Sequence, residues 1–315
     1  MDEMGEFIPP HSLSTSVLFL IFNRPDTTQQ VFDEIRKAQP PQLFVAADGP
    51  RKDRPADYEL CKKTRDIIQQ VNWDCKVFTR FQDKNLGCKI GVSSAIDWFF
   101  SNVDKGIILE DDCVPNQSFF PFCQELLEKY REDERVMMIS GMNYLFNKIE
   151  MNESYFFSRY YPVWGWATWK RAWSQYDLTM SDWPEYNSQN FLNHIYCHTK
   201  IAGFLQEMFQ KAYSNKIDTW DIQWVFTCVV NSGISISPKY NLTSNIGVTG
   251  SHADNVGRFH YMPVKALNVT NICHPRHVIP NITLDKISFD EITKSESVPA
   301  KIRGLFYHIR KSKTK

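Results

Sequence analysis

Short strand-like segments alternate with longer segments of helical periodicity over the first 140 residues of the chain. The strand-like segments are mostly uninterrupted apolar runs, and they lie at 17–22, 43–47, 76–81, 106–109 and 136–139. Such runs are typical of strands covered on both faces, as in a parallel sheet. Between them, apolar residues recur at helical spacing, for example Val31 with Ile35. The alternation predicts an α/β fold with a mostly parallel sheet flanked by helices.

Length and charge narrow the class of protein. The chain has 315 residues, 43% of them hydrophobic, and equal numbers of basic and acidic residues, 36 of each. A nucleic-acid partner is not expected, because such proteins usually carry a basic excess. No apolar stretch approaches the roughly 20 residues of a membrane span, and the acidic N-terminus does not resemble a signal peptide. Because the eight cysteines form no Cys-x-x-Cys pair, we expect a cytoplasmic protein with reduced thiols and no zinc site.

Polar residues directly follow three of the predicted strands. They are Asn23-Arg24 after the first strand, Asp48 after the second and Glu110-Asp111-Asp112 after the fourth. Right-handed crossovers bring the ends of successive parallel strands to one edge of the sheet. Ligands in open α/β sheets bind outside the carboxyl ends of the strands. The sequence therefore predicts a ligand site that contains these residues.

The three adjacent acidic residues are the most informative part of that site. Neighbouring carboxylates repel one another, and a divalent cation removes the repulsion. Hard cations such as Mn²⁺ or Mg²⁺ take carboxylate oxygens together with phosphate and water. If the strand continued through the motif, Glu110 and Asp112 would face one way and Asp111 the other. The alternative is a solvated turn at the end of a strand.

The second half of the chain is rich in aromatic residues. Five of the nine tryptophans fall between residues 155 and 183, at Trp164, Trp166, Trp169, Trp173 and Trp183. Such rings stack on sugar faces, but they also build ordinary cores. We expect most of the five to be core residues and Trp164 or Trp166 to line an acceptor cleft. Gly165, between them, would allow the backbone to approach a ligand closely.

Six motifs occur in an order that resembles a known family. They are LFLIFNRPDTT, ADGPR, NLGCKIG, IILEDDCVPNQSFFPF, PVWGWATWKRAW and TWDIQW. Together they resemble nucleotide-sugar-dependent glycosyltransferases of the A fold (GT-A), in particular bacterial relatives of the N-acetylglucosaminyltransferase I family. The resemblance implies a single Rossmann-type catalytic domain over 15–255, with a nucleotide-binding half (15–145) and an aromatic-rich acceptor half (146–255). A basic C-terminal extension, 256–315, lies outside it.

The resemblance also implies roles for the residues that bind the donor. Arg24 would lie near the nucleotide, Lys89 near the donor, and His252 in a loop over the diphosphate. Asp48 would accept a hydrogen bond from the uracil N–H, because a carboxylate is a pure acceptor. Glu110 and Asp111 would face the donor sugar and the ribose, and Asp112 would bind the metal in a DXD-like motif.

Asp221 is the candidate catalytic base. It lies between Trp220 and Trp224, where apolar neighbours would raise its pKa. The resembled family places its base in a similar Trp-Asp stretch, followed by a second acidic residue, whereas Ile222 follows here. Asp218 is the reserve candidate, and the alternative role for Asp221 is that of a helix N-cap.

The function expected from the resemblance is metal-dependent glycosyl transfer with inversion. A hexosyl or N-acetylhexosaminyl group would move from a UDP-linked donor to a glycan or lipid-linked acceptor, as in polysaccharide biosynthesis. The alternatives are a non-catalytic carbohydrate-binding protein on a transferase fold, a glycoside hydrolase with paired carboxylates, and a sugar-nucleotide nucleotidyltransferase. The last should carry a Gly-rich basic loop where residues 22–25 read Phe-Asn-Arg-Pro.

The tail beyond residue 299 is basic and carries no acidic residue. Apolar residues at helical spacing between 302 and 309 indicate a helix that either lies on an anionic membrane or is simply solvated. The first alternative would place the enzyme peripherally at the inner face of the membrane.

Overall fold

The computed structural model describes residues 7–145, 148–196, 198–247 and 262–294. Its first half alternates strands and helices as the apolar runs predict. The elements are β1 (Val17–Ile21), α1 (Pro25–Ala38), β2 (Gln42–Ala47), α2 (Ala56–Asp66), the 3-10 helix η1 (Ile67–Gln70), β3 (Lys76–Phe81), α3 (Gly87–Phe100), β4 (Lys105–Glu110), β5 (Cys113–Pro115), α4 (Phe119–Lys129) and β6 (Val136–Ser140).

The second half contains more helix and shorter strands. Its elements are β7 (Tyr155–Ser158), β8 (Trp166–Trp169), α5 (Lys170–Trp173), α6 (Trp183–Ser188), α7 (Phe191–Tyr196), α8 (Thr199–Tyr213), α9 (Asp221–Val230), β9 (Ile234–Pro238), β10 (Thr243–Asn245) and α10 (Ile282–Lys294). Within the described part of the chain, no helix in either half is long and apolar enough to cross a membrane.

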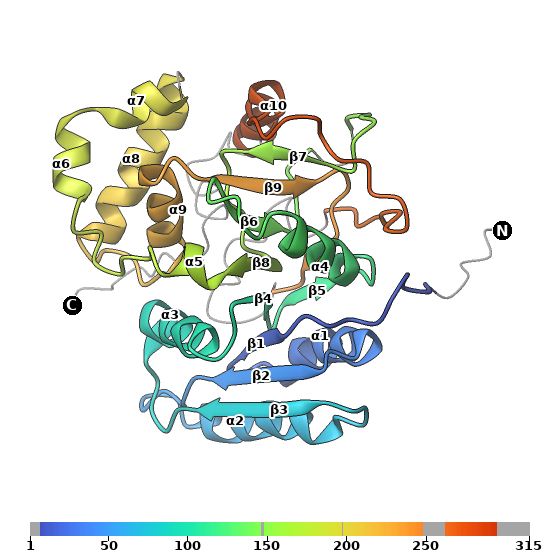
Figure 1. Cartoon of the computed structure of the whole chain (residues 1–315). Coiled ribbons are helices and arrows are strands. Elements are labelled where there is room, and N and C mark those ends of the chain that lie inside the picture. The colour runs from blue at the N-terminus through green and yellow to red at the C-terminus, as the bar shows by residue number, and fades with distance from the viewer. Residues whose placement is uncertain (1–6, 146–147, 197, 248–261, 295–315) are drawn as a thin grey trace.

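A single sheet runs through both halves (Figure 1). Within the described residues it has eight strands in the order β3-β2-β1-β4-β8-β6-β9-β7. The strands β3, β2, β1 and β4 are mutually parallel. Strand β8 lies antiparallel between β4 and β6, and β7 lies antiparallel to β9, which is parallel to β6. All strands except β8 and β7 therefore run in one direction, which confirms the expected mostly parallel α/β sheet.

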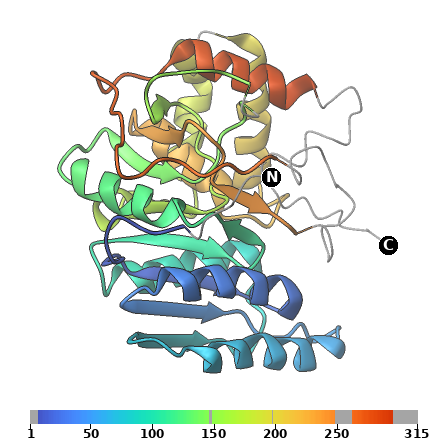
Figure 2. The ribbon, with the colours of Figure 1, turned by 90° about the vertical axis from the view of Figure 1, so that its right-hand side faces the viewer.

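Helices cover both faces of the sheet, so the central strand β1 is apolar throughout. All five residues of β1 are buried, and their side chains alternate between two hydrophobic clusters. Leu18 and Leu20 pack in the cluster that includes α3, whereas Val17 and Phe19 pack in the cluster that includes α1 and α4. Figure 2 shows α1 and α2 on the same side of the parallel strands. Burial on both faces explains the uninterrupted apolar runs.

Four of the five clustered tryptophans are core residues. Trp166, Trp169, Trp173 and Trp183 are each at most 4% exposed. The indole of Trp166, on β8, stacks on that of Trp220 with ring centroids 5.6 Å apart. The prediction that most of the cluster is core is confirmed. The acceptor role predicted for Trp166 is wrong, because its fully buried ring leaves no surface for a ligand.

Gly165 has a structural reason that the sequence did not reveal. Its φ is +70°, a conformation that side chains other than glycine's rarely adopt. A Cβ atom built on it would lie 2.6 Å from Cγ2 of Thr243. Gly165 therefore packs against Thr243 and does not line the cavity described below. Its predicted role in acceptor binding is corrected to one in backbone geometry and packing.

Part of the predicted C-terminal extension packs on the sheet. Helix α10 lies against β7, where the buried Asp285 carboxylate accepts hydrogen bonds from Ser158 Oγ (2.5 Å) and the Arg159 backbone N–H (3.0 Å). The basic segment at 302–309, for which a membrane contact was considered, lies outside the described residues.

Gly165→Ala is expected to lower the free energy of unfolding by about 2 kcal/mol or more, because it adds backbone strain and a clash. Gly203→Ala is the control: Gly203 is an exposed residue of α8 whose added Cβ would meet no atom within 4 Å. That substitution should stabilise the protein by about 0.5–1 kcal/mol. Urea denaturation of both variants measures the two effects, and equal effects would refute the packing role of Gly165.

Candidate functional site

A cavity of about 470 Å³ opens at the carboxyl ends of β1, β2, β3 and β4. Open α/β sheets bind their ligands at this edge. The cavity wall includes most residues that the sequence predicted for the site: Arg24, Asp48, Glu110, Asp111, Asp112, Trp164, Asp218 and Asp221. Lys89, Gly165 and Trp166 are not part of that wall, and His252 lies outside the described residues.

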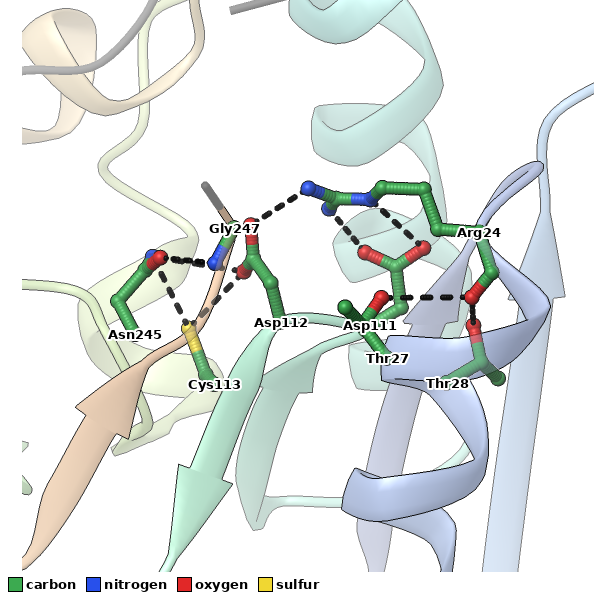
Figure 3. Close-up of polar contacts among 8 residues, drawn as sticks. All are labelled: Arg24, Thr27, Thr28, Asp111, Asp112, Cys113, Asn245 and Gly247. Atoms are coloured by element: carbon green, nitrogen blue, oxygen red, sulfur yellow. Dashed lines mark hydrogen bonds and ion pairs between the residues drawn. The ribbon is translucent and has the colours of Figure 1, made fainter. Parts of the chain in front are cut away.

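The acidic motif is held by Arg24 (Figure 3). The Nε and Nη2 groups of Arg24 both donate to the Asp111 carboxylate, and Nη1 donates to Oδ2 of Asp112 at 2.8 Å. This bidentate contact is among the strongest pairings available to a carboxylate. The side chains of Asp111 and Asp112 are only 4% and 10% exposed. Two of the three carboxylates therefore share one internal cation, whose single positive charge offsets part of the negative charge of the motif.

Local structure puts Arg24 in place. Strand β1 pairs with β4 in parallel, with Leu20 opposite Glu110, so the two strand ends are neighbours. Pro25 begins α1, a position where its missing N–H costs nothing. The carbonyl oxygen of Arg24 accepts hydrogen bonds from the backbone N–H and the hydroxyl of Thr28, at 3.0 and 2.7 Å. The start of the helix thus fixes the backbone from which the guanidinium reaches the acidic motif.

Glu110 is the third acidic residue and behaves differently. Its side chain forms no hydrogen bond or ion pair with any residue that the structure describes. Burial, together with the charges of Asp112 and Asp111, raises the pKa of Glu110 to about 8, so this carboxyl is mainly protonated at pH 7. The prediction that Glu110 and Asp112 share a face is wrong, because β4 ends at Glu110 and the two aspartates lie in the turn that follows.

The residues around Asp112 test whether a divalent cation fits. Within the described part of the chain, no three His, Cys, Asp or Glu side chains are grouped as metal ligands. A cation that arrives with a diphosphate needs only one or two carboxylates, since phosphate and water complete its shell. Asp112 can supply one such carboxylate. In this structure the positive charge beside its Oδ2 is the Arg24 guanidinium. A metal would therefore have to share Asp112 with Arg24.

Asp48 has a different role from the predicted one. Its Oδ1 accepts hydrogen bonds from the N–H groups of Gly49 (2.8 Å) and Leu86 (2.9 Å). Its Oδ2 accepts from Asn85 Nδ2 (2.8 Å) and the Gly87 N–H (3.1 Å). Four donors fill the lone-pair sites of a carboxylate. Asp48 therefore anchors the start of α3, and the predicted hydrogen bond to a uracil N–H has no free acceptor.

Asp218 also stabilises the start of α3, the helix that contains Lys89. Asp218 accepts hydrogen bonds from the N–H groups of Cys88 (3.2 Å) and Lys89 (3.0 Å), so it caps the helix. Because both of its carboxylate oxygens accept these hydrogen bonds, Asp218 is less suited than expected to act as the reserve base. The Lys89 ammonium donates to Oδ1 of Asn215 at 3.0 Å, and it does not line the cavity. The donor contact predicted for Lys89 is not offered by this geometry.

Asp221 is the carboxylate best placed to exchange a proton. It is the first residue of α9, and its Oδ1 accepts hydrogen bonds from the Thr219 hydroxyl and the Ile222 N–H. Its Oδ2 has no hydrogen-bond partner among the described residues. Burial raises the pKa of Asp221 to about 6, although the Thr219 hydrogen bond opposes the shift. A buried carboxylate with one free oxygen can accept a proton near neutral pH.

Several cavity residues were not predicted from the sequence. Arg80 follows the same strand-end rule as Asp48, so its position near the end of β3 could have indicated it. Arg51 forms a bidentate ion pair with Asp57, which lies only 6 residues further along the chain. Asn245 reaches the acidic motif because β10 pairs with β5, a long-range contact for which the sequence gives no local signal.

Comparison with known proteins finds similar solved structures but no matching family model or curated protein. The similar solved structures include mouse xyloside xylosyltransferase 1 in its apo form, with 10% identity, a TM-score of 0.32, and coverage of 69% of this chain and 81% of that one. HddC from Yersinia pseudotuberculosis is 10% identical, with a TM-score of 0.28 and coverage of 40% and 57%.

A third similar structure is UDP-glucose pyrophosphorylase complexed with UDP-glucose, with 11% identity, a TM-score of 0.26 and coverage of 46% and 62%. The chain thus spans less than two-thirds of HddC and of this pyrophosphorylase. Likeness at this level does not assign an activity to the chain.

Arg24→Gln is expected to lower the free energy of unfolding by roughly 3 kcal/mol, because it leaves two buried carboxylates without their cation. Added Mn²⁺ should restore part of this stability, since a divalent ion can replace the lost charge, whereas the wild-type protein should gain much less. Thermal unfolding with and without Mn²⁺ measures the difference.

The control for this experiment is Arg51→Gln, which breaks the Arg51–Asp57 ion pair away from the acidic motif. It should destabilise the protein without any rescue by Mn²⁺. Equal rescue of both variants would show that the ion does not act at Asp111 and Asp112.

Proposed function

We propose that the protein is a glycosyltransferase that moves a sugar from a nucleoside-diphosphate sugar to an acceptor hydroxyl with inversion. One observation carries the proposal: the free, buried Asp221 oxygen shares a cavity with the acidic motif and its partner Arg24. Such a transfer needs a proton acceptor on one side of the anomeric carbon and a cationic group for the departing diphosphate on the other. The motif resemblance supports the same reaction class.

Asp221 would act as the general base. Its Oδ2 takes the proton from the acceptor hydroxyl. At the same time, the oxygen of that hydroxyl forms a bond to the anomeric carbon of the donor. The bond from that carbon to the diphosphate breaks, and the diphosphate leaves with the electron pair. Thr219 and the Ile222 N–H hold the other oxygen of Asp221, which fixes the orientation of the carboxylate.

Arg24 and Asp112 would receive the diphosphate end of the donor. Among the described residues, the Arg24 guanidinium forms the ion pairs with the acidic motif, and its donors suit phosphate oxygens as well as carboxylates. A Mn²⁺ or Mg²⁺ ion bound by Asp112 would neutralise charge on the departing diphosphate. Glu110, whose pKa is raised, would remain a neutral hydrogen-bond donor toward the sugar at pH 7.

Trp164 would form the acceptor side of the cavity. It is partly buried and lines the cavity, unlike its neighbour Trp166. Its backbone carbonyl accepts a hydrogen bond from the Thr243 hydroxyl at 2.6 Å, which fixes the segment. An indole face held in this way suits stacking on a sugar ring of a glycan or lipid-linked acceptor. The transferred group would be a hexosyl or N-acetylhexosaminyl unit from a UDP-linked donor.

Asp221→Asn should retain nucleotide binding and lose transfer by about 10²–10⁴-fold, because Asn cannot accept the proton. In the wild-type protein the rate should rise with pH through about 6, the pKa of Asp221, since only the ionised carboxylate acts as a base. Between pH 7 and pH 5 the rate should fall by about tenfold. A product assay with a panel of sugar nucleotides and glycan acceptors measures both.

Asp285→Asn is the matched control, because burial also raises the pKa of Asp285 to about 6, but this residue lies on α10 outside the cavity. This variant should keep the wild-type pH profile. Full transfer by Asp221→Asn would refute the assignment of the base.

A further inference from the structure

Among the described residues, three arginines line the cavity, and they differ in their partners. Arg24 is paired with Asp111 and Asp112, and Arg51 is paired with Asp57. Arg80 forms no ion pair with any residue that the structure describes, and its one side-chain hydrogen bond goes from Nη1 to Ser94 Oγ at 3.2 Å. A guanidinium carries five N–H donors. Most donors of Arg80 are therefore free for a ligand in the cavity.

Arg80 lies at the end of the cavity farthest from the acidic motif along the sheet. The strands run in the order β3-β2-β1-β4, so three strand spacings, roughly 14 Å, separate β3 from β4. A nucleoside diphosphate in an extended conformation can span this distance. If its phosphates lie near Arg24, as in the proposed function, its base reaches Arg80.

The wall around Arg80 leaves room for a flat ring. In the sheet register, Arg80 is opposite Ala46 of β2. Gly91 and Ala95 of α3 also line the cavity, and these three residues carry little or no side chain. The side chain of Gln82 lines the same part of the cavity without a hydrogen-bond partner among the described residues. Small residues beside free polar groups are typical of a pocket that holds an aromatic ring.

We propose that Arg80 reads the nucleobase of the donor by donating to the keto oxygen at C4 of uracil or C6 of guanine. This inference rests on the proposed function. Asp48, the residue first expected to read the base, has no free acceptor. Arg80 has donors only, so it favours a keto oxygen and disfavours the amino group that cytosine and adenine carry at the same position. Gln82 can accept the neighbouring ring N–H of the keto bases.

The test compares matched nucleotides that differ at this position, UDP with CDP and GDP with ADP, by isothermal titration calorimetry. The wild-type protein should bind the keto member of at least one pair about 10- to 100-fold more tightly than its amino partner. Arg80→Gln should weaken binding of the keto member by about tenfold or more and remove most of this preference. The control, Lys76→Gln, removes a positive charge from the exposed start of β3 and should change nothing.

Three results would overturn the inference in distinguishable ways. Unchanged nucleotide affinity in Arg80→Gln, with a wild-type unfolding temperature, would show that Arg80 does not contact the ligand. Equal weakening of both members of a pair would show that Arg80 binds phosphate or ribose. If the wild-type protein binds none of the four nucleotides, with or without Mn²⁺, the proposed function fails together with the inference.

Discussion

The ion pairing of Arg24 with Asp111 and Asp112 is the interaction on which the candidate site depends. It joins the ends of two neighbouring strands, β1 and β4, and sets one guanidinium against two buried carboxylates. Buried charges are tolerated when they are paired and hydrogen-bonded, and Arg24 supplies both kinds of contact. Burial and the neighbouring carboxylates raise the pKa of Glu110, the third acidic residue, which favours its protonated form. A guanidinium supplies a single positive charge, so Arg24 offsets only part of the negative charge of the motif.

Much of the fold could be predicted from the sequence, because burial leaves a direct mark on it. Strands such as β1 and β2 are covered on both faces, so their residues, Gln42 at the start of β2 excepted, are apolar and the run is visible. Strands β7 and β8 are not apparent from the sequence. The run that forms β8, Trp-Ala-Thr-Trp, resembles part of an aromatic cluster, although its pairing with β4 and β6 makes it a central strand. Pairing between distant segments leaves no local pattern, so it could not be predicted from one sequence.

The site could be predicted in its location but only partly in its details. The rule that ligands bind at the ends of parallel strands placed Arg24, Asp48 and the acidic motif Glu110-Asp111-Asp112 near one another in the cavity wall. The same rule could not show that the hydrogen-bonding capacity of Asp48 is filled by the start of α3. Nor could it show that Trp166 lies in the core while Trp164, two residues away, lines the cavity. Such differences depend on packing, which the type of residue does not reveal.

The central position of β8 constrains how the molecule can move. Because β8 is hydrogen-bonded to β4 on one side and to β6 on the other, the two halves of the chain share one continuous sheet. A hinge between the halves would have to break those hydrogen bonds, so domain closure of the kind seen in two-domain kinases is not available here. A ligand would instead enter and leave the cavity through movement of side chains and loops at its rim. The relative position of the two halves of the sheet is therefore set once, when the chain folds.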